Sequence, residues 1–449
     1  MFRRLLIANR GEVAVRVARA CRDLGVAPIG VASEADLGSS WTEAMDEVVC
    51  LGPAPATASY LDPVKIVQAA RQTHASALHP GWGFLAESPL LAALCRQHGI
   101  TFVGPPAGVI AQMGVKSPAK AAMRAAGLPV VPGSDGNVAD VDEALAAARA
   151  VGFPVMLKAD RGGGGRGMRR CEDEATLREA YTAARAEAEA AFGAGEIYLE
   201  KLLERGRHIE VQILCDAFGN GVHLGERECS VQRKHQKLIE ESPSPALDAA
   251  GRAALGESAV RAALALGYVN AGTIEFLRAS DGSIYFMEMN TRLQVEHPVT
   301  EMVTGVDIVQ EQLRIAANRP LGLTAEGVAF SGAAIECRIN AEDPKQGFRP
   351  SPGKLETFDL PTDRGPGTIR VETHLTAGEN VSPHYDSLVA KVIARADTRE
   401  RAIETMLACL RAARVEGIAT TIPVHLAVLA SDAFRRGEYD TSAVPGWRH

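Results

Sequence analysis

Residues 288–298 read EMNTRLQVEHP, and every second residue from 288 to 296 is polar. In an extended chain successive side chains alternate between two faces, so these polar groups are predicted to share one face. They are Glu288, Asn290, Arg292, Gln294 and Glu296. The pattern alone is more typical of the solvated face of a half-buried strand than of a site, so the residues upstream decide its meaning.

Two β-rich runs lie immediately upstream, within residues 273–289, TIEFLRASDGSIYFMEM. They flank Asp281-Gly282, a signal for a hairpin with a two-residue turn. Such a turn places residue 278 opposite residue 285 and Glu275 opposite Glu288. Two carboxylates directly opposed at about 5 Å repel each other unless a cation joins them. Because Mg²⁺ binds one or two carboxylates together with phosphate oxygens, the hairpin predicts a magnesium site.

Several long motifs resemble those of the biotin carboxylase family of ATP-grasp ligases, and they occur in the family's order. They are HPGWGFLAES (79–88), KADRGGGGRGMR (158–169), CSVQRKHQK (229–237), EMNTRLQVEHPVTE (288–301) and ECRINAEDP (336–344). The resemblance spans about residues 2–430. It implies Mg-ATP-dependent carboxylation of biotin by bicarbonate, as the first half-reaction of acetyl-CoA carboxylation in fatty acid synthesis.

Composition excludes several other classes of protein. The chain has 449 residues, 46% of them apolar and 23% charged, which predicts two to three globular domains. A net charge of −7 gives no basic surface for nucleic acid, and no apolar run is long enough for a membrane span. The N-terminus is interpreted as a first strand rather than a signal peptide. Eight scattered cysteines favour reduced thiols in a cytoplasmic protein.

The order of apolar runs predicts an α/β fold with three domains. Residues 3–105 alternate strands with helices and predict a doubly wound, mainly parallel sheet in a domain over residues 1–113. The family resemblance implies an ATP-grasp domain over 114–329, with a mobile lid at about 130–203, and a C-terminal α/β domain over 330–449. Strands are expected at 4–9, 28–33, 47–52, 76–80, 100–105, 153–159, 197–203, 208–214 and 333–340, and helices at 12–24, 62–73, 174–191, 303–317 and 398–414.

By resemblance, one set of residues binds ATP. A glycine run between a lysine-bearing strand and the next segment suits a loop that covers phosphates, although Met168-Arg169 excludes a Walker A motif. On their own, the lysines and histidines of this set would be ordinary surface residues. The set is Lys116, Lys158, Gly164, Gly165, Glu200, Lys201, Leu203, His208, His235 and Lys237.

A second set would perform the chemistry. Glu275, Glu288 and Asn290 would hold Mg²⁺ or Mn²⁺, as two ions. Arg292, Gln294 and the N–H of Val295 would bind bicarbonate, and Glu296 would act as the general base. Lys237 would meet the transferring phosphoryl group or bicarbonate. Arg338, which on its own would be interpreted as a charge on an edge strand, would stabilise the enolate-like oxygen of biotin.

Five positions depart from the family's usual residues. Trp82 replaces a tyrosine and cannot accept a hydrogen bond. Val115 replaces an acid, and Asp160-Arg161 replaces a small residue and a glycine, which is expected to stiffen the base of the loop. Arg19 and Asp23 stand where the family has an Arg/Glu pair at its homodimer interface.

The expected partners follow from a missing motif. In the related family the biotinylated lysine lies between two methionines, and none of the ten methionines here is adjacent to a lysine. This chain is therefore expected to act on biotin held by a separate biotin carboxyl carrier protein, beside carboxyltransferase subunits.

Three alternatives stay open at this stage. The same half-reaction serves propionyl-CoA, methylcrotonyl-CoA and pyruvate carboxylation. An ATP-grasp amine or acid ligase would share the metal hairpin and lid, but would not need Arg292, Glu296 and Arg338 together. A silent nucleotide-binding scaffold is favoured only by the departures at 82, 115 and 160–161.

Overall fold

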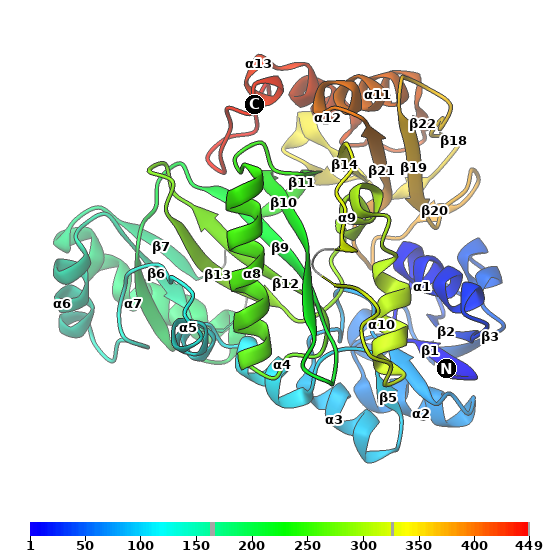
Figure 1. The fold of residues 1–449 in the computed structure, drawn as a ribbon, viewed down its shortest axis with the longest axis horizontal. Helices are drawn as coiled ribbons and strands as arrows, with labels where there is room; N and C mark the ends of the chain where they lie inside the picture. The colour runs from blue at the N-terminus through cyan, green and yellow to red at the C-terminus, as the bar shows by residue number, and fades with distance from the viewer. Residues whose placement is uncertain (162–166, 325–326, 448–449) are drawn as a thin grey trace.

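The computed structural model describes residues 1–161, 167–324 and 327–447. Its N-terminal part is a five-stranded parallel sheet in the order β3-β2-β1-β4-β5 (Figure 1). The strands are β1 (Arg4–Ile7), β2 (Ala27–Ser33), β3 (Glu47–Gly52), β4 (Ala77–His79) and β5 (Thr101–Phe102). The helices are α1 (Gly11–Asp23), α2 (Pro63–Gln72), α3 (Pro89–Gln97) and α4 (Ala107–Met113), with short 3₁₀ turns η1 (Ser40–Ala44) and η2 (Ala56–Ala58).

Both faces of this sheet are covered, as the period-2 pattern of β1 requires. Leu5 and Ile7 pack into the core that contains α1, whereas Leu6 and Ala8 pack into the core that contains α2 and α3. The predicted doubly wound domain is confirmed. Its strand order reverses between β1 and β4, and ligands bind such sheets beyond the strand ends at that point. The loop after β4, residues 80–88, starts there.

The centre of the molecule is an antiparallel sheet of eight strands, β13-β12-β9-β10-β11-β14-β21-β19. Helix α8 (Ala249–Ala265) packs on one face of it (Figure 1). The strands are β9 (Arg207–Cys215), β10 (Gly221–Arg233), β11 (Gln236–Ser242), β12 (Asn270–Arg278), β13 (Ile284–Asn290), β14 (Ala333–Asn340), β19 (Thr368–Thr373) and β21 (Leu388–Ala396).

The eight-stranded sheet is strongly curved. Lys237 of β11 and Glu275 of β12 are three strands apart, which in a flat sheet would separate their backbones by about 14 Å. Their side-chain atoms Nζ and Oε1 are nonetheless 2.9 Å apart. The curvature therefore brings side chains from distant strands together on the concave face, which is where the site lies.

The segment predicted as a lid forms a separate small sheet, β7-β6-β8, beside two helices (Figure 1). It consists of β6 (Val155–Ala159), β7 (Met168–Cys171), β8 (Ile197–Lys201), α6 (Val141–Val151) and α7 (Glu174–Phe192). The strand predicted at 197–203 ends at Lys201, so Leu203 lies beyond it in the connection to β9. Helix α5 (Lys116–Ala125) precedes the lid.

The C-terminal part extends the large sheet and covers it with α11 (Arg399–Ala412) and α12 (Ile422–Ala430). Three two-stranded ladders and short helical turns complete it. They are β15 (Glu342–Asp343) with β16 (Arg349–Pro350), β17 (Gly353–Lys354) with β20 (Asn380–Val381), β18 (Thr357–Asp359) with β22 (Arg414–Glu416), η4 (Pro344–Gln346) and α13 (Asp432–Arg435).

The metal hairpin was predicted correctly at its key pair but wrongly at its turn. Ala279 N–H donates to Ser283 O at 2.8 Å, so the turn has three residues, with Gly282 in the left-handed region. Residue 278 consequently faces 284, not 285. An extra residue at 287 forms a bulge that restores the register, and Glu275 does face Glu288.

Two further predictions were wrong. The extended stretch expected over 288–296 ends at Asn290, and Glu296 is instead the N-cap of α9 (His297–Thr304), with φ −81° and ψ 10°. The single helix expected at 303–317 is two helices, α9 and α10 (Ile308–Ala316). Gly305 separates them in a left-handed conformation that ends the first helix.

Membrane-spanning helices and disulfides are both missing from the part of the chain that the structure describes. Among the described residues, none of the helices has the length and apolar character needed to cross a membrane. All eight cysteines are free, and only Cys50 is exposed.

Candidate active site

A cavity of about 730 Å³ lies where the lid, the concave face of the large sheet and the loop after β4 meet. The structure places nearly every predicted site residue on its wall. These are Lys116, Lys158, Glu200, Lys201, Leu203, His208, His235, Lys237, Glu275, Glu288, Asn290, Arg292, Gln294, Val295 and Arg338. Glu296 is fully buried beneath the wall and contacts two of these residues. Gly164 and Gly165 lie outside the described residues.

The two carboxylates of the metal hairpin differ sharply in their electrostatics. Burial and the charge of Glu275 raise the pKa of Glu288 to about 7. Burial also disfavours the charged form of Glu275, but Lys237 and His208 outweigh it and lower the pKa of that carboxyl. Asn290 Nδ2 donates to Glu275 Oε1 at 2.8 Å. Two opposed carboxylates, one of them poorly neutralised, with an amide beside them fit a hard divalent cation.

Lys237 joins three carboxylates. Its Nζ lies 2.6 Å from Glu210 Oε2, 2.9 Å from Glu275 Oε1 and 2.6 Å from Glu296 Oε1. Although burial opposes the charge, these carboxylates raise the pKa of Lys237 well above its usual value. The ammonium therefore stays charged and holds residues from β9, β12 and the turn before α9 around one point.

Glu296 and Arg338 form the next part of this network. Arg338 Nη2 lies 2.8 Å from Glu296 Oε2, and its Nε donates to Glu240 Oε1 at 2.6 Å. Burial alone would raise the pKa of Glu296, but Lys237, Arg338 and Arg227 hold it well below the usual range. The carboxylate is thus ionised and can accept a proton from a group bound in the cavity.

Arg292 is held by neighbours on both sides of its guanidinium. Its Nε donates to Glu87 Oε2 at 2.9 Å, and Nη2 donates to Asn290 Oδ1 at 2.7 Å. Nη1 donates to Gln294 Oε1 at 3.2 Å. The loop after Asn290 therefore bends so that the arginine lies between the metal hairpin and the loop after β4.

The residues predicted to contact ATP line the other end of the cavity. Lys158 of β6 pairs with Glu200 of β8, and Lys120 of α5 pairs with the same carboxylate at 2.7 Å. Burial lowers the pKa of Lys116, at the start of α5. Lys201 Nζ donates to the carbonyl oxygens of Gly152 and Phe153 at 3.0 and 2.8 Å, so its ammonium is tied to the lid backbone.

Two histidines approach from the large sheet. His208 Nε2 is 2.9 Å from Glu275 Oε2; burial lowers the pKa of His208, but this carboxylate outweighs burial and raises it overall. His235 lies with Lys234 in the two-residue turn between β10 and β11, and both have positive φ. Such a conformation is unusual for residues other than glycine and is often found at functional sites. Burial and Lys158 lower the pKa of His235.

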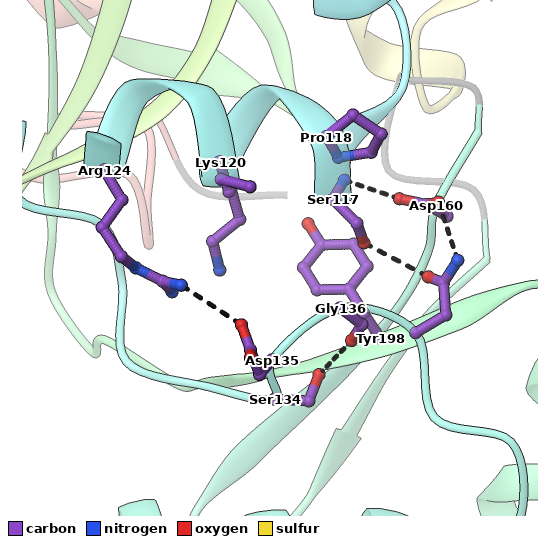
Figure 2. A pocket seen from close by; sticks show the side chains of 11 residues that line it. Ser117, Pro118, Lys120, Arg124, Ser134, Asp135, Gly136, Asp160 and Tyr198 are labelled. Carbon is purple, nitrogen blue, oxygen red and sulfur yellow. Dashed lines mark hydrogen bonds and ion pairs between the residues drawn. The ribbon is translucent and has the colours of Figure 1, made fainter. Parts of the chain in front are cut away.

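A second cavity of about 390 Å³ lies behind Tyr198, which also borders the main cavity (Figure 2). On its wall Asp160, one of the departures, accepts hydrogen bonds from Ser117 N–H at 2.7 Å and Asn137 Nδ2 at 3.0 Å. Helix α5 has no cap from its own N-cap residue, Val115. Asp160 supplies that cap and ties the base of the glycine-rich segment to the helix that begins with Lys116.

Four buried or bridging residues were not predicted from the sequence. Glu210 bonds Lys237 and the fully buried Arg227, Glu240 bonds Arg338, and Glu87 bonds Arg292. A signal existed for Glu210, since the alternation that selected His208 places Glu210 on the same face of β9. Glu87 lies within HPGWGFLAES, one of the motifs that resemble the family. Glu240 and Arg227 carried no signal beyond being charges in apolar strands.

The predicted interface pair makes contacts within its own chain. Arg19 Nη2 lies 2.6 Å from Glu372 Oε1, and Asp23 Oδ2 accepts from Gln310 Nε2 at 3.2 Å. The arginine side chain is about half exposed. Neither contact tests the homodimer, which stays a prediction.

Three family models match the chain. They are the biotin carboxylase N-terminal domain over residues 1–110, the carbamoyl-phosphate synthase L chain ATP binding domain over 116–324, and the biotin carboxylase C-terminal domain over 336–445. The chain is 48% identical over 442 residues to biotin carboxylase 1 of Bacillus subtilis, with 98% of each chain covered. It is 46% identical over 448 residues to one of the pyruvate carboxylase subunits of Methanothermobacter thermautotrophicus, covering 100% of this chain and 90% of that one.

Among solved structures, the chain resembles the biotin carboxylase domain dimer of 2-oxoglutarate carboxylase from Hydrogenobacter thermophilus. The TM-score is 0.94 at 47% identity, and 98% of this chain and 96% of that chain are covered. That structure is a complex with MgADP, ADP and bicarbonate.

Proposed function

This chain belongs to the biotin carboxylase family of ATP-dependent ligases, and we propose that it carboxylates biotin held by a separate carrier protein for a bacterial acetyl-CoA carboxylase. Enzymes of this family use ATP, Mg²⁺ and biotin. One observation supports the residue roles most directly. Glu296 is ionised between Lys237 and Arg338, and the same lysine reaches the metal hairpin.

The first task of the site is to make the γ-phosphoryl group transferable. Glu275 and Glu288, with Asn290, would hold the metal, and Mg²⁺ bound there neutralises charge on the β- and γ-phosphates. Lys116, Lys158 and Lys237 would stabilise the remaining negative charge, since phosphoryl transfer depends mainly on positioning and electrostatics. Gly164 and Gly165 would cover the phosphates, and Glu200, Lys201 and Leu203 would line the adenine pocket with His208 and His235 nearby.

The second task is to activate bicarbonate. Arg292 would bind it bidentately, aided by Gln294 and the Val295 N–H. Glu296 removes the hydroxyl proton while a bicarbonate oxygen attacks the γ-phosphorus and ADP leaves, which gives carboxyphosphate. To reach the anion, Arg292 must exchange part of its contact with Glu87 or Asn290 for the substrate. The 19% exposure of its side chain leaves room for that exchange.

The third task is carboxyl transfer. Carboxyphosphate breaks into CO₂ and phosphate, and the phosphate takes the ureido N–H proton of biotin. Arg338 stabilises the resulting enolate-like oxygen, and the nitrogen captures CO₂. Because Arg338 is fixed by Glu240 and Glu296, its charge is oriented before biotin arrives.

The final acceptor and the assembly are the finer parts of the proposal. Relatives include proteins of pyruvate and 2-oxoglutarate carboxylases, so the acetyl-CoA assignment rests on resemblance to free-standing biotin carboxylases. We propose a cytoplasmic homodimer that works with carboxyltransferase subunits. Pulling down a biotinylated carrier protein from the native host, and identifying its transferase, tests this part.

The activity itself is tested by phosphate release from Mg-ATP with and without bicarbonate and free biotin. Release should require bicarbonate and increase with biotin. Glu296→Gln should reduce it about 100- to 1,000-fold. Glu257→Gln, an exposed change on α8, is the matched control and should keep full activity. ATP hydrolysis indifferent to bicarbonate and biotin would favour another ATP-grasp ligase or a scaffold and refute the proposal.

A further inference from the structure

A fully buried lysine supports the backbone between two proposed active-site groups. Lys391 of β21 has no solvent exposure, and its Nζ donates to the carbonyl oxygen of Val295 at 2.9 Å. That carbonyl belongs to the peptide joining Val295, whose N–H is assigned to bicarbonate, to Glu296, the assigned base. The lysine therefore fixes the peptide plane that carries the Cα of Glu296, and the Val295 N–H lies in the preceding peptide, joined to this plane at the Val295 Cα.

The charge of this lysine is matched by Glu12. Glu12 Oε2 lies 3.0 Å from Lys391 Nζ, and the carboxylate is 3% exposed. Glu12 is in the first turn of α1, where the helix N-terminus favours a negative charge. A buried ion pair needs partners for its remaining atoms, and the second oxygen of Glu12 has one.

That partner is Trp82, one of the departures from the family pattern. Its indole N–H donates to Glu12 Oε1 at 2.9 Å, and its ring lines the main cavity at the end of the doubly wound sheet. Since an indole can only donate, the contact with a carboxylate satisfies it fully. In the sequence Trp82 is only the loss of a hydrogen-bond acceptor, whereas in the structure it is a donor with a defined partner.

We propose that Trp82, Glu12 and Lys391 form a positioning chain that sets the Val295–Glu296 peptide for bicarbonate binding and deprotonation. This inference rests on the proposed function. The positioning chain links the loop after β4, helix α1 and strand β21 to the backbone at Val295 and Glu296. None of the three residues needs to touch bicarbonate; each acts through the next, and the last holds the carbonyl.

The mildest test is Trp82→Phe, which keeps an aromatic ring and removes the N–H. We expect kcat/KM for bicarbonate to fall about tenfold, while KM for ATP stays within about twofold. Trp41→Phe is the matched control: the Trp41 indole is buried in the N-terminal core and has no hydrogen-bond acceptor among the described residues. It should leave both constants unchanged. An equal loss for both substrates, or no loss, would overturn the positioning chain.

A double-mutant cycle tests whether the residues act in series. Glu12→Gln keeps an acceptor for the indole but removes the charge beside Lys391, so it should lower kcat/KM for bicarbonate more than Trp82→Phe does. Adding Trp82→Phe to Glu12→Gln should then cost little more, whereas independent roles would give additive losses. Additive losses in kcat/KM for bicarbonate would refute the positioning chain.

A readout independent of turnover separates this inference from the proposed function. In the ¹⁵N-tryptophan-labelled protein, Glu12→Gln should shift the indole resonance of Trp82 and leave those of Trp41 and Trp447 in place. If the wild-type protein shows no bicarbonate-dependent turnover, the proposed function fails while this signal still tests the contact. If the Trp82 resonance does not move, the proposed positioning chain is refuted.

Discussion

Lys237 and Glu296 approach to 2.6 Å between Nζ and Oε1, although one belongs to β11 and the other to the turn before α9. The contact depends on the curvature of the eight-stranded sheet, which turns β11 toward the metal hairpin. It also couples the protonation of the proposed base to a lysine assigned to the phosphoryl group. Mutations at either residue should therefore affect the pH dependence of turnover as well as its rate.

Lys237→Met should lower kcat about 100- to 1,000-fold, because three carboxylates lose their shared cation. The pKa of Glu296 should rise at the same time, so the acidic limb of the pH–rate profile should move to higher pH. Steady-state assays between about pH 5.5 and 9 measure both effects. Lys354→Met, at an exposed strand end, is the control. A variant with near-normal kcat and an unmoved acidic limb would exclude this role for Lys237.

Metal affinity should increase with pH, because the pKa of Glu288 near 7 means that a proton competes with the cation. With one proton displaced, Mn²⁺ should bind about tenfold more tightly at pH 8 than at pH 6 in the presence of ADP. Electron paramagnetic resonance of free Mn²⁺ measures the binding. Glu288→Gln should weaken it and remove this part of the pH dependence, while Glu257→Gln should retain both.

The same raised pKa has a consequence for the metal-free protein. Between the ordinary value of 4.5 and about 7, Glu288 binds a proton in the folded state that it loses in the unfolded state. Its contribution to the free energy of unfolding is therefore present at low pH and lost as the pH rises through about 7. Mg²⁺ with nucleotide should remove that loss.

Asp160→Ala should loosen the start of α5, since the Ser117 N–H loses its side-chain acceptor. A lost cap of this kind costs about 1 kcal/mol, so the Ser117 amide should exchange with solvent about fivefold faster. KM for ATP should rise because Lys116 begins the same helix. Asp135→Ala is the control, because this acid lines the same cavity (Figure 2) and its side chain is fully exposed. Unchanged exchange at Ser117 would show that Asp160 is not its cap.

The protein should lose stability below about pH 6.5, and His79 should account for part of the loss. Burial lowers the pKa of His79 to about 4, and its Nδ1 accepts from Gly81 N–H at 2.9 Å. An unfolded histidine gains its proton near 6.5 while the folded one does not, so the free energy of unfolding falls as pH drops toward 4. Urea midpoints at pH 7, 6 and 5 should decline less steeply in His79→Gln. The exposed His98→Gln should decline like the wild type.

The metal hairpin shows how far sequence reasoning reached and where it stopped. The Glu275–Glu288 pair was predicted by counting from a two-residue turn, and the actual turn has three residues. A bulge at 287 compensates for the difference, and no local signal in the sequence announces it. The alternating pattern of residues 288–296 correctly identified polar groups that meet, but they meet around a bend rather than along a strand.

The doubly wound domain was predictable because its apolar periodicity is strong, and so were four strands of the large sheet, β9, β12, β13 and β14. The buried residues that pair with site residues were not predictable. Glu210, Glu240 and Arg227 reach their ion-pair partners only once the strands lie side by side in the curved sheet. The break between α9 and α10 was also not predictable from the local sequence. Gly305 could be a tolerated helix residue or a helix end, and only the packing of the following segment decides.

The ladder between β11 and β14 crosses the boundary that separates the second and third family models along the chain. Ile239 pairs with Cys337 and Glu240 with Glu336, so the segments matched by these two models share hydrogen bonds in one sheet. A slip of one residue in this pairing would turn Arg338 to the opposite face, away from Glu240 and Glu296. A chimera that takes its C-terminal domain from a relative must therefore keep the β11–β14 register. If that pairing shifted by one residue, the chimera could fold and still be inactive.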